Sequence, residues 1–304
     1  MSTRFSHSRV EVFDRCPFKY RLRYVDGLDT IPNTDADNAL ILGTALHTGI
    51  EEGVEQALDF YKNSFPVLTD DHIHEMMKLE AMIPKAKAML PPGGTFELPI
   101  GNADFIGFMD YLWPCGWDSR TNETLFDLYD FKYSNNAKNY AVSGQLHEYK
   151  YWYELTHPGH RIRNMYFLIV PKPKIRQKST ETLSQFRDRL QAALKDAEPT
   201  LMPVQYNPMK IVDFLTDVKH MVEATDFPKN PNHFCGWCEY EEYCQKGWDS
   251  VYRRYKEYCI ANNFQALSKI EFSRQITKRC GFTTVPKWIR NRKTRVFVKG
   301  GDTE

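Results

Sequence analysis

The chain has 304 residues, of which 42% are hydrophobic and 14% aromatic, a content that fills a sizeable core and excludes a disordered protein. No apolar run reaches the roughly 20 residues of a membrane-spanning helix, and residues 1–10 lack the apolar stretch of a signal peptide. We therefore expect a soluble, cytoplasmic protein. The net charge of +1 hides an asymmetry, because residues 251–304 hold 13 lysines and arginines against four acidic residues. This basic tail on an acidic body predicts a polyanion-binding module.

Helices are predicted in the first third of the chain, where apolar residues recur at helical spacing. The first has Ser8 and Glu11 in the register of a capping box. The sequence Pro-Pro-Gly-Gly at 91–94 ends helical structure. The three predicted helices cover residues 8–24, 40–61 and 71–89.

Strands dominate the middle of the chain. Four are predicted, at residues 95–99, 104–113, 124–133 and 162–170. An aromatic-rich helix lies between the last two, and a basic, proline-containing loop and two more helices follow, covering residues 143–156, 171–178, 181–197 and 208–224. This order predicts an α/β fold with a mixed sheet flanked by helices.

Two carboxylates and a lysine stand at the ends of neighbouring predicted strands. Asp110 follows an apolar run, and Asp130-Phe131-Lys132 ends the next strand. Because side chains alternate along a strand, Asp130 and Lys132 share one face, and pairing of the strands would bring Asp110 beside them. Carboxylates bind Mg²⁺ or Mn²⁺, the carbonyl of Phe131 offers a further oxygen, and Lys132 could position or deprotonate a water. The alternative interpretation is a set of ordinary strand-end charges.

Four motifs occur in a fixed order around these residues. They are Gly-x-x-x-His at 43–47, Gly-x-x-Asp at 107–110, Asp-x-Lys at 130–132 and Gln-x-x-x-Tyr at 145–149. This order resembles the RecB-like branch of the PD-(D/E)xK nucleases, which includes AddB-type recombination nucleases and the iron–sulfur exonucleases of CRISPR adaptation. The resemblance implies a restriction-endonuclease-like core and a metal-dependent DNA exonuclease in phage or bacterial recombination, replication or end processing.

The resemblance also implies roles for individual residues. The implied metal ligands are His47, Asp110, Asp130 and the backbone carbonyl of Phe131. Lys132 is implied to be catalytic, and Gln145 and Tyr149 to contact DNA or order the site. Glu97 stands where relatives often have an acidic residue and receives no definite role. A structure-specific endonuclease and an inactive DNA-binding scaffold remain alternatives, although a scaffold has no need of the carboxylates and the lysine.

Three of the seven cysteines form the pattern Cys-x2-Cys-x5-Cys at 235–244, and Cys16 is the candidate for a fourth ligand. By ligand type, zinc and a 4Fe–4S cluster fit Cys16, Cys235, Cys238 and Cys244 equally well. The resemblance implies the 4Fe–4S cluster and makes Zn²⁺ the lesser alternative. Such a site would fasten the N-terminal helix to the end of the nuclease domain. The other three, Cys115, Cys259 and Cys280, are interpreted as ordinary small buried residues.

The basic tail is predicted to be a separate domain, 249–304, after a nuclease domain, 1–248. A helix ending near Asn263, a second helix over 268–280 and two strands at 283–289 and 294–298 predict a winged-helix module. This segment resembles the C-terminal winged-helix module of phage and poxvirus-type primase–helicases. A solvated basic tail or a protein-docking element is the alternative.

DNA, as single strands or ends, is the expected partner, alongside possible replication or recombination proteins. The basic side chains expected to contact phosphates are Arg274, Lys278, Arg279, Arg292 and Lys293. A phage-encoded protein would act in the host cytoplasm.

Overall fold

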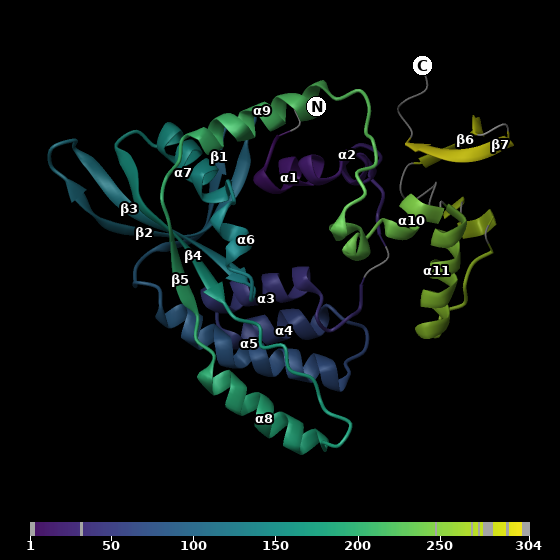
Figure 1. Ribbon diagram of the computed structural model, residues 1–304, viewed down its shortest axis with the longest axis horizontal. Coiled ribbons are helices and arrows are strands. Elements are labelled where there is room, and N and C mark those ends of the chain that lie inside the picture. Colours follow the sequence, from purple (N-terminus) through teal and green to yellow (C-terminus); the bar gives the residue numbers. More distant parts are fainter. Residues whose placement is uncertain are drawn as a thin grey trace. The chain divides into compact units, whose positions relative to one another are not determined.

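A computed structural model describes residues 4–30, 33–246, 248–268, 270–272, 274–275, 282–289 and 292–299 (Figure 1). The chain forms two compact units. Unit 1 comprises Met1–His7 and Asn33–Val218, and unit 2 comprises Ser8–Pro32 and Lys219–Glu304. Within the described residues, no helix is long and apolar enough to cross a membrane.

A five-stranded mixed sheet forms the centre of unit 1. Its strands, in spatial order, are β1 Thr95–Gly101, β2 Ile106–Asp118, β3 Glu123–Tyr133, β4 His160–Val170 and β5 Thr200–Val204. The pair β3–β4 is parallel and the other three pairs are antiparallel. The four predicted strands and the mixed sheet are confirmed. The edge strand β5 was not predicted, because it spans five residues and contains Pro203, which is tolerated in a strand only at an edge.

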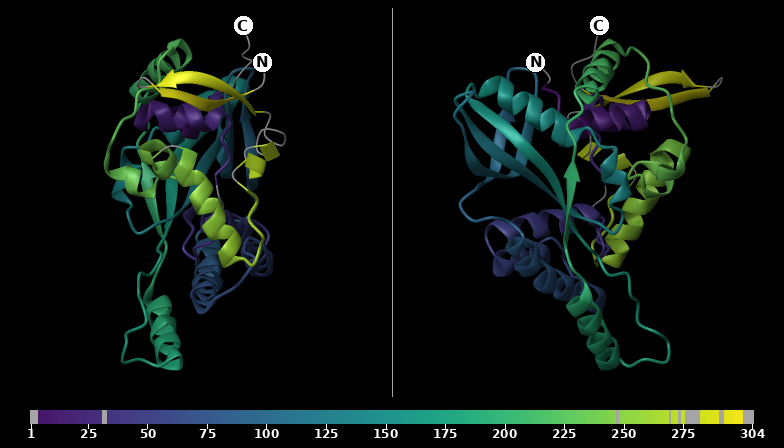
Figure 2. Two further views of the ribbon diagram at one scale, coloured as in Figure 1. Left: turned by 90° about the vertical axis from the view of Figure 1, so that its right-hand side faces the viewer. Right: turned by 60° about the vertical axis from the view of Figure 1, so that its left-hand side comes forward.

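Helices cover both faces of this sheet. Those of unit 1 are α3 Ala39–Glu51, α4 Val54–Asn63, α5 Asp70–Ala88, α6 Lys138–Ala141, α7 Gln145–Thr156 and α8 Leu183–Asp196, and α9 Met209–Glu223 begins there. The views agree that α3, α4 and α5 form a layer on one side of the sheet and that α7 lies on the other (Figures 1 and 2). The helix predicted over 40–61 is two helices, because Gly53 adopts a φ of 129° between them.

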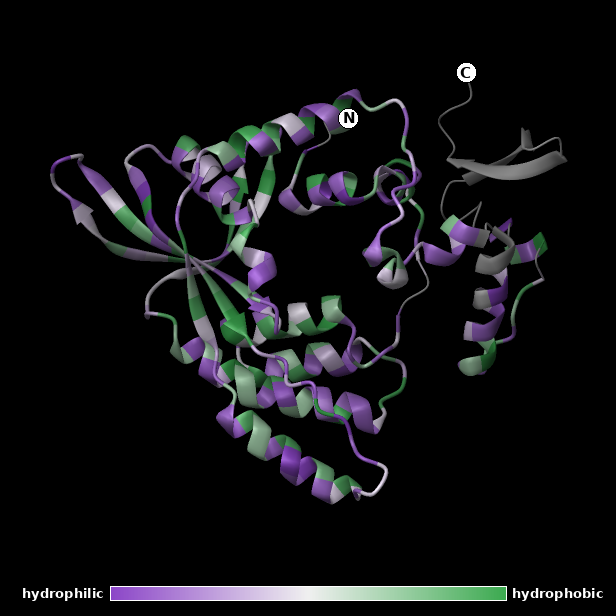
Figure 3. Ribbon diagram, in the orientation of Figure 1, coloured by the Kyte–Doolittle hydropathy of each residue, from purple (hydrophilic) through white to green (hydrophobic). Residues whose placement is uncertain are grey.

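The apolar core of unit 1 lies between the sheet and the α3–α5 layer. Leu42 and Leu46 of α3 and Leu79 of α5 are fully buried against Tyr129 and Phe131 of β3. Figure 3 shows hydrophobic residues recurring between hydrophilic ones along these helices, as helices with one buried side require. On the opposite face, aromatic side chains of α7 stack on the sheet, including Trp152 against Phe105.

Unit 2 joins the N-terminal helices to the cysteine-containing segment. Its elements are α1 His7–Arg15 (whose first residue belongs to unit 1), α2 Pro17–Tyr20, the π-helical η1 Arg21–Val25, the 3₁₀ helix η2 His233–Trp237, α10 Glu241–Lys246, α11 Trp248–Ala261, β6 Phe282–Ile289 and β7 Arg292–Lys299. The predicted continuous helix over 8–24 is interrupted at Cys16, whose backbone is extended (φ −162°, ψ 100°). A residue before proline disfavours the helical conformation, and Pro17 then starts α2.

The C-terminal part of unit 2 contains the predicted hairpin. Strands β6 and β7 are antiparallel, with Ile289 opposite Arg292. Before them, Tyr255 of α11 stacks on Phe272 with ring centroids 4.2 Å apart. Arg274 is exposed, whereas Lys278, Arg279, Cys280 and the side chains of Arg292 and Lys293 lie outside the described residues.

Candidate active site

The site begins where β2 and β3 separate. Their ladder ends at the pair Tyr111–Tyr129, one residue before Asp110 and Asp130 would face each other. Beyond that point the N–H of Phe131 donates to Asp110 Oδ2 at 2.6 Å, in place of a backbone partner on β2. Where the two strands separate, the backbone of β3 is thus contacted by side chains from two other elements, Asp110 of β2 and His47 of α3.

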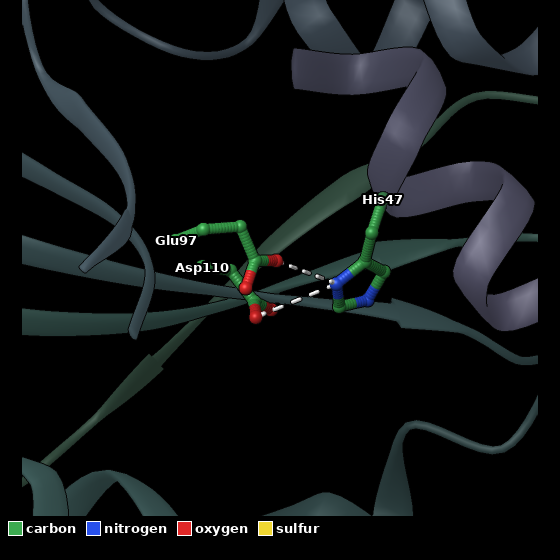
Figure 4. A group of neighbouring side chains, drawn as sticks. All are labelled: His47, Glu97 and Asp110. Carbon is green, nitrogen blue, oxygen red and sulfur yellow. Dashed lines mark ion pairs between the residues drawn. The ribbon is translucent and has the colours of Figure 1, made fainter. Parts of the chain in front are cut away.

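His47 of α3 reaches into this opening from the helical layer (Figure 4). One edge of its ring, Nε2, lies 3.1 Å from the carbonyl oxygen of Phe131. The other nitrogen, Nδ1, lies 3.4 Å from Asp110 Oδ1 and 3.8 Å from Glu97 Oε1. Burial alone would lower the pKa of His47, but the charge and hydrogen bond of Asp110, together with Glu97, outweigh it and raise the pKa to about 10. Each ring nitrogen of His47 thus faces oxygen atoms, Nε2 the Phe131 carbonyl and Nδ1 the two carboxylates.

The side chain of Glu97 on β1 also points toward His47, and the backbone conformation of Glu97 is unusual. Its φ of 46° lies in the left-handed region, between the residues Phe96 and Leu98 that pair with β2. A left-handed conformation costs a non-glycine residue about 1–2 kcal/mol, so the surrounding sheet must enforce it.

Together His47, Glu97 and Asp110 offer one donor atom each, all within 4.8 Å of one another. Two carboxylates and an imidazole suit Mg²⁺, and suit Mn²⁺ still better. The donor atoms are of the kinds that bind these ions, and they converge on one point. The donor set therefore fits a divalent metal ion.

A second set of contacts leads from Asp130 to α7. Lys132 Nζ lies 2.5 Å from Asp130 Oδ2 and donates to Gln145 Oε1 at 2.9 Å. Gln145 Nε2 in turn donates to the hydroxyl oxygen of Tyr149 at 2.9 Å. We call Asp130, Lys132, Gln145 and Tyr149 the buried polar chain. The four residues predicted here from sequence thus lie in contact.

The charges of the buried polar chain are set by burial and by one another. Burial raises the pKa of Asp130 to about 6, although Lys132 acts in the opposite direction. Burial would lower the pKa of Lys132, but Asp130 and Asp110 outweigh it and raise that pKa above its usual value. A lysine held as a cation stabilises negative charge and donates hydrogen bonds, and is a poor proton acceptor.

The glycines of the motifs differ in what they do. A Cβ on Gly107 would lie 2.9 Å from Cε1 of Tyr149, so the bare backbone of β2 is what admits the tyrosine ring. A Cβ on Gly43 would meet nothing within 4 Å. The glycine of Gly-x-x-Asp is therefore required sterically, and that of Gly-x-x-x-His is not.

Comparison with protein-family models identifies one family, the PD-(D/E)XK nuclease superfamily, over residues 4–245. The chain belongs to this superfamily. It is thus a metal-dependent nuclease with DNA as its substrate, and the predicted fold class is confirmed. None of the curated proteins compared with the chain matches it.

The four predicted cluster ligands of the nuclease all belong to unit 2. The side chains of Asn230 and Asn232 donate to the carbonyl of Arg15 at 3.0 and 3.2 Å, which holds the residue before Cys16 against the cysteine segment. Burial raises the pKa of Cys238, and the nearby Cys16 adds to this. Among the described residues, the group of side chains placed to hold a metal ion contains no cysteine.

The sequence did not assign a role to Glu97, which completes the donor set of the nuclease. Its residue type and strand position were visible, but its left-handed backbone and its approach to His47 are properties of the folded chain. The contact between His47 and the Phe131 carbonyl was also not predicted.

Proposed function

We propose that this nuclease is a DNA exonuclease whose site consists of His47, Asp110, Asp130, the Phe131 carbonyl, Lys132, Gln145 and Tyr149. The proposal rests on two groups of side chains that lie where β2 and β3 separate. One is the metal-donor set of His47, Glu97 and Asp110, and the other is the buried polar chain. In hydrolysis of a phosphodiester, a bound cation can activate the attacking water, and a fixed positive charge can stabilise the charge that develops on the phosphate.

The residues would divide the reaction between them. His47, Asp110 and Asp130 would hold a Mg²⁺ or Mn²⁺ ion, which would supply an activated water and offset charge on the phosphate. Lys132, held as a cation by Asp130, stabilises the negative charge that builds on the attacked phosphate. Gln145 fixes the direction of the Lys132 ammonium group, and Tyr149 fixes Gln145. This favours a positioning role for Lys132 over removal of a proton.

The exonuclease mode rests on the resemblance of the four ordered motifs to RecB-like nucleases. Its test is digestion of end-labelled linear single-stranded DNA beside a closed circle, with Mn²⁺ or with EDTA. We expect metal-dependent loss of the linear DNA alone, with the label reporting the direction of cleavage. Cleavage of the circle would establish an endonuclease instead.

A matched pair of variants ties the cleavage to the site. Asp130→Asn should abolish it, whereas Asp71→Asn, at an exposed position of α5, should not. No cleavage by a folded, metal-loaded wild type would favour the inactive scaffold.

We propose further that Cys16, Cys235, Cys238 and Cys244 hold a 4Fe–4S cluster. Four thiolates suit zinc and a 4Fe–4S cluster equally well by ligand type, and the resemblance to the iron–sulfur nucleases favours the cluster. The N–H of Asn232 points at Cys235 Sγ at 3.4 Å, a contact typical of liganded thiolates. Cys238→Ser should lose iron and visible absorption, and Cys115→Ser should lose neither. Zinc without iron in the wild type would contradict the proposal.

The segment 249–304 is proposed to be a winged-helix module that binds DNA phosphates through Arg274, Lys278, Arg279, Arg292 and Lys293. The antiparallel hairpin and the exposed Arg274 support it. Replacing Arg292 and Lys293 by glutamine should weaken DNA binding and flatten its dependence on salt, because fewer counterions are released. An unchanged slope would leave the basic segment without a DNA role. The division into domains 1–248 and 249–304 stays a prediction.

A further inference from the structure

We propose that Glu97 is a metal ligand of this nuclease, completing a set with His47 and Asp110. This inference rests on the proposed function of the same site and adds a carboxylate from β1, an element that contributes nothing else to it.

The distances match those of ligands that share one ion. With metal–ligand bonds of about 2.1 Å, neighbouring ligand atoms of an octahedral ion lie about 3.0 Å apart and opposite ones about 4.2 Å apart. Nδ1 of His47 lies 3.4 Å from Asp110 Oδ1 and 3.8 Å from Glu97 Oε1, and all three donors fall within 4.8 Å of one another (Figure 4). Small side-chain movements would therefore close the set around an ion.

The carboxylates of the site differ in what already holds them. Asp130 is 1% exposed and lies in close contact with the Lys132 ammonium group. Glu97 is 45% exposed, and its one ion pair among the described residues is with His47, itself a member of the donor set. An ion bound by His47 and Asp110 would therefore meet Glu97 without breaking any ion pair of that residue outside the donor set.

The backbone of Glu97 supports a functional reason for its position. Three non-glycine residues of the described chain have positive φ: Glu97, Asn122 and Asn263. Asparagine tolerates this conformation and glutamate does not, so Glu97 carries a strain that the two asparagines largely avoid. Strain of this kind persists where a side chain must be aimed at a particular point.

Glu51 provides a control of equal charge. It lies one helical turn after His47 on α3, and burial, followed by the charge of Glu97, raises its pKa, so the two carboxylates are neighbours. Glu51 does not belong to the donor set. Neutralising it changes the local field without removing a ligand.

The experiment measures Mn²⁺ binding to the full-length protein by calorimetry and by electron paramagnetic resonance. Glu97→Gln should weaken Mn²⁺ affinity at least about tenfold and change the resonance of the bound ion. Glu51→Gln should weaken it by no more than about threefold, because it acts through screened charge alone. Equal losses in the two variants, or an unchanged affinity in Glu97→Gln, would overturn the inference. A wild type that does not bind Mn²⁺ would instead overturn the proposed function with it.

Glu97→Gly separates a ligand from a structural residue. Glycine relieves the left-handed backbone, so the melting temperature should stay the same or rise while Mn²⁺ affinity falls as in Glu97→Gln. A lower melting temperature with unchanged Mn²⁺ affinity would show that Glu97 only supports the sheet.

Discussion

The metal-donor set and the buried polar chain lie side by side where β2 and β3 separate, yet they are built differently. The donor set draws one residue from each of α3, β1 and β2, and two of its members, His47 and Glu97, are partly exposed, whereas Asp110 is buried. The buried polar chain is fixed by successive contacts between β3 and α7. An exchangeable ion needs an accessible set of oxygens, whereas a fixed charge needs a dry, rigid setting. The comparison predicts that loss of His47 weakens Mn²⁺ binding, whereas loss of Lys132 lowers the cleavage rate with Mn²⁺ bound.

The largest expected effect comes from the fixed charge. Lys132→Ala should lower the rate of cleavage by about 10²–10³-fold, the loss typical of removing one donor that stabilises transition-state charge. It should leave Mn²⁺ affinity within a few-fold of wild type, since Lys132 is not a donor to the ion. Single-turnover cleavage of labelled DNA measures the first effect, and calorimetry measures the second. Lys138→Ala, on the short helix α6, is the control and should be active. Full activity of Lys132→Ala would separate the lysine from the chemistry.

A smaller effect is expected from the packing between β2 and α7. Gly107→Ala places a methyl group against the Tyr149 ring and should destabilise the fold by about 1–3 kcal/mol, as overpacking does. Gly43→Ala, in the interior of α3 with open space around it, should instead stabilise by about 0.5–1 kcal/mol. Urea unfolding of both variants checks this contrast. Equal destabilisation of the two would contradict the steric reason given for Gly107.

The smallest effect should come from the far end of the buried polar chain. Tyr149→Phe removes the hydroxyl that accepts from Gln145 and should lower the cleavage rate by about fivefold, corresponding to about 1 kcal/mol for one neutral hydrogen bond. Lys132 keeps its contacts with Asp130 and Gln145 in this variant. A rate as low as that of Lys132→Ala would mean that Tyr149 contacts the substrate directly.

The resemblance of four ordered motifs gave the roles of His47, Gln145 and Tyr149, and strand alternation gave the arrangement of the carboxylates and the lysine. Alternation placed Asp130 and Lys132 on one face and brought Asp110 near them, because each residue is local to a long apolar strand. The break at Cys16 and the end of α3 before Gly53 depend on single backbone conformations, which helical periodicity does not reveal. The left-handed backbone of Glu97 is imposed by the neighbouring strand, so no pattern in the local sequence predicts it.

The most direct test of the account is the cleavage rate of labelled linear DNA as a function of Mn²⁺ concentration, for wild type, His47→Ala and Lys132→Ala. His47→Ala should raise the Mn²⁺ concentration at which the cleavage rate is half-maximal, so that the maximal rate is reached only at higher Mn²⁺ concentrations. Lys132→Ala should lower the plateau and leave half-saturation unchanged. Variants that changed the same quantity in the same way would contradict the division between His47, which binds the ion, and Lys132, which acts on the phosphate.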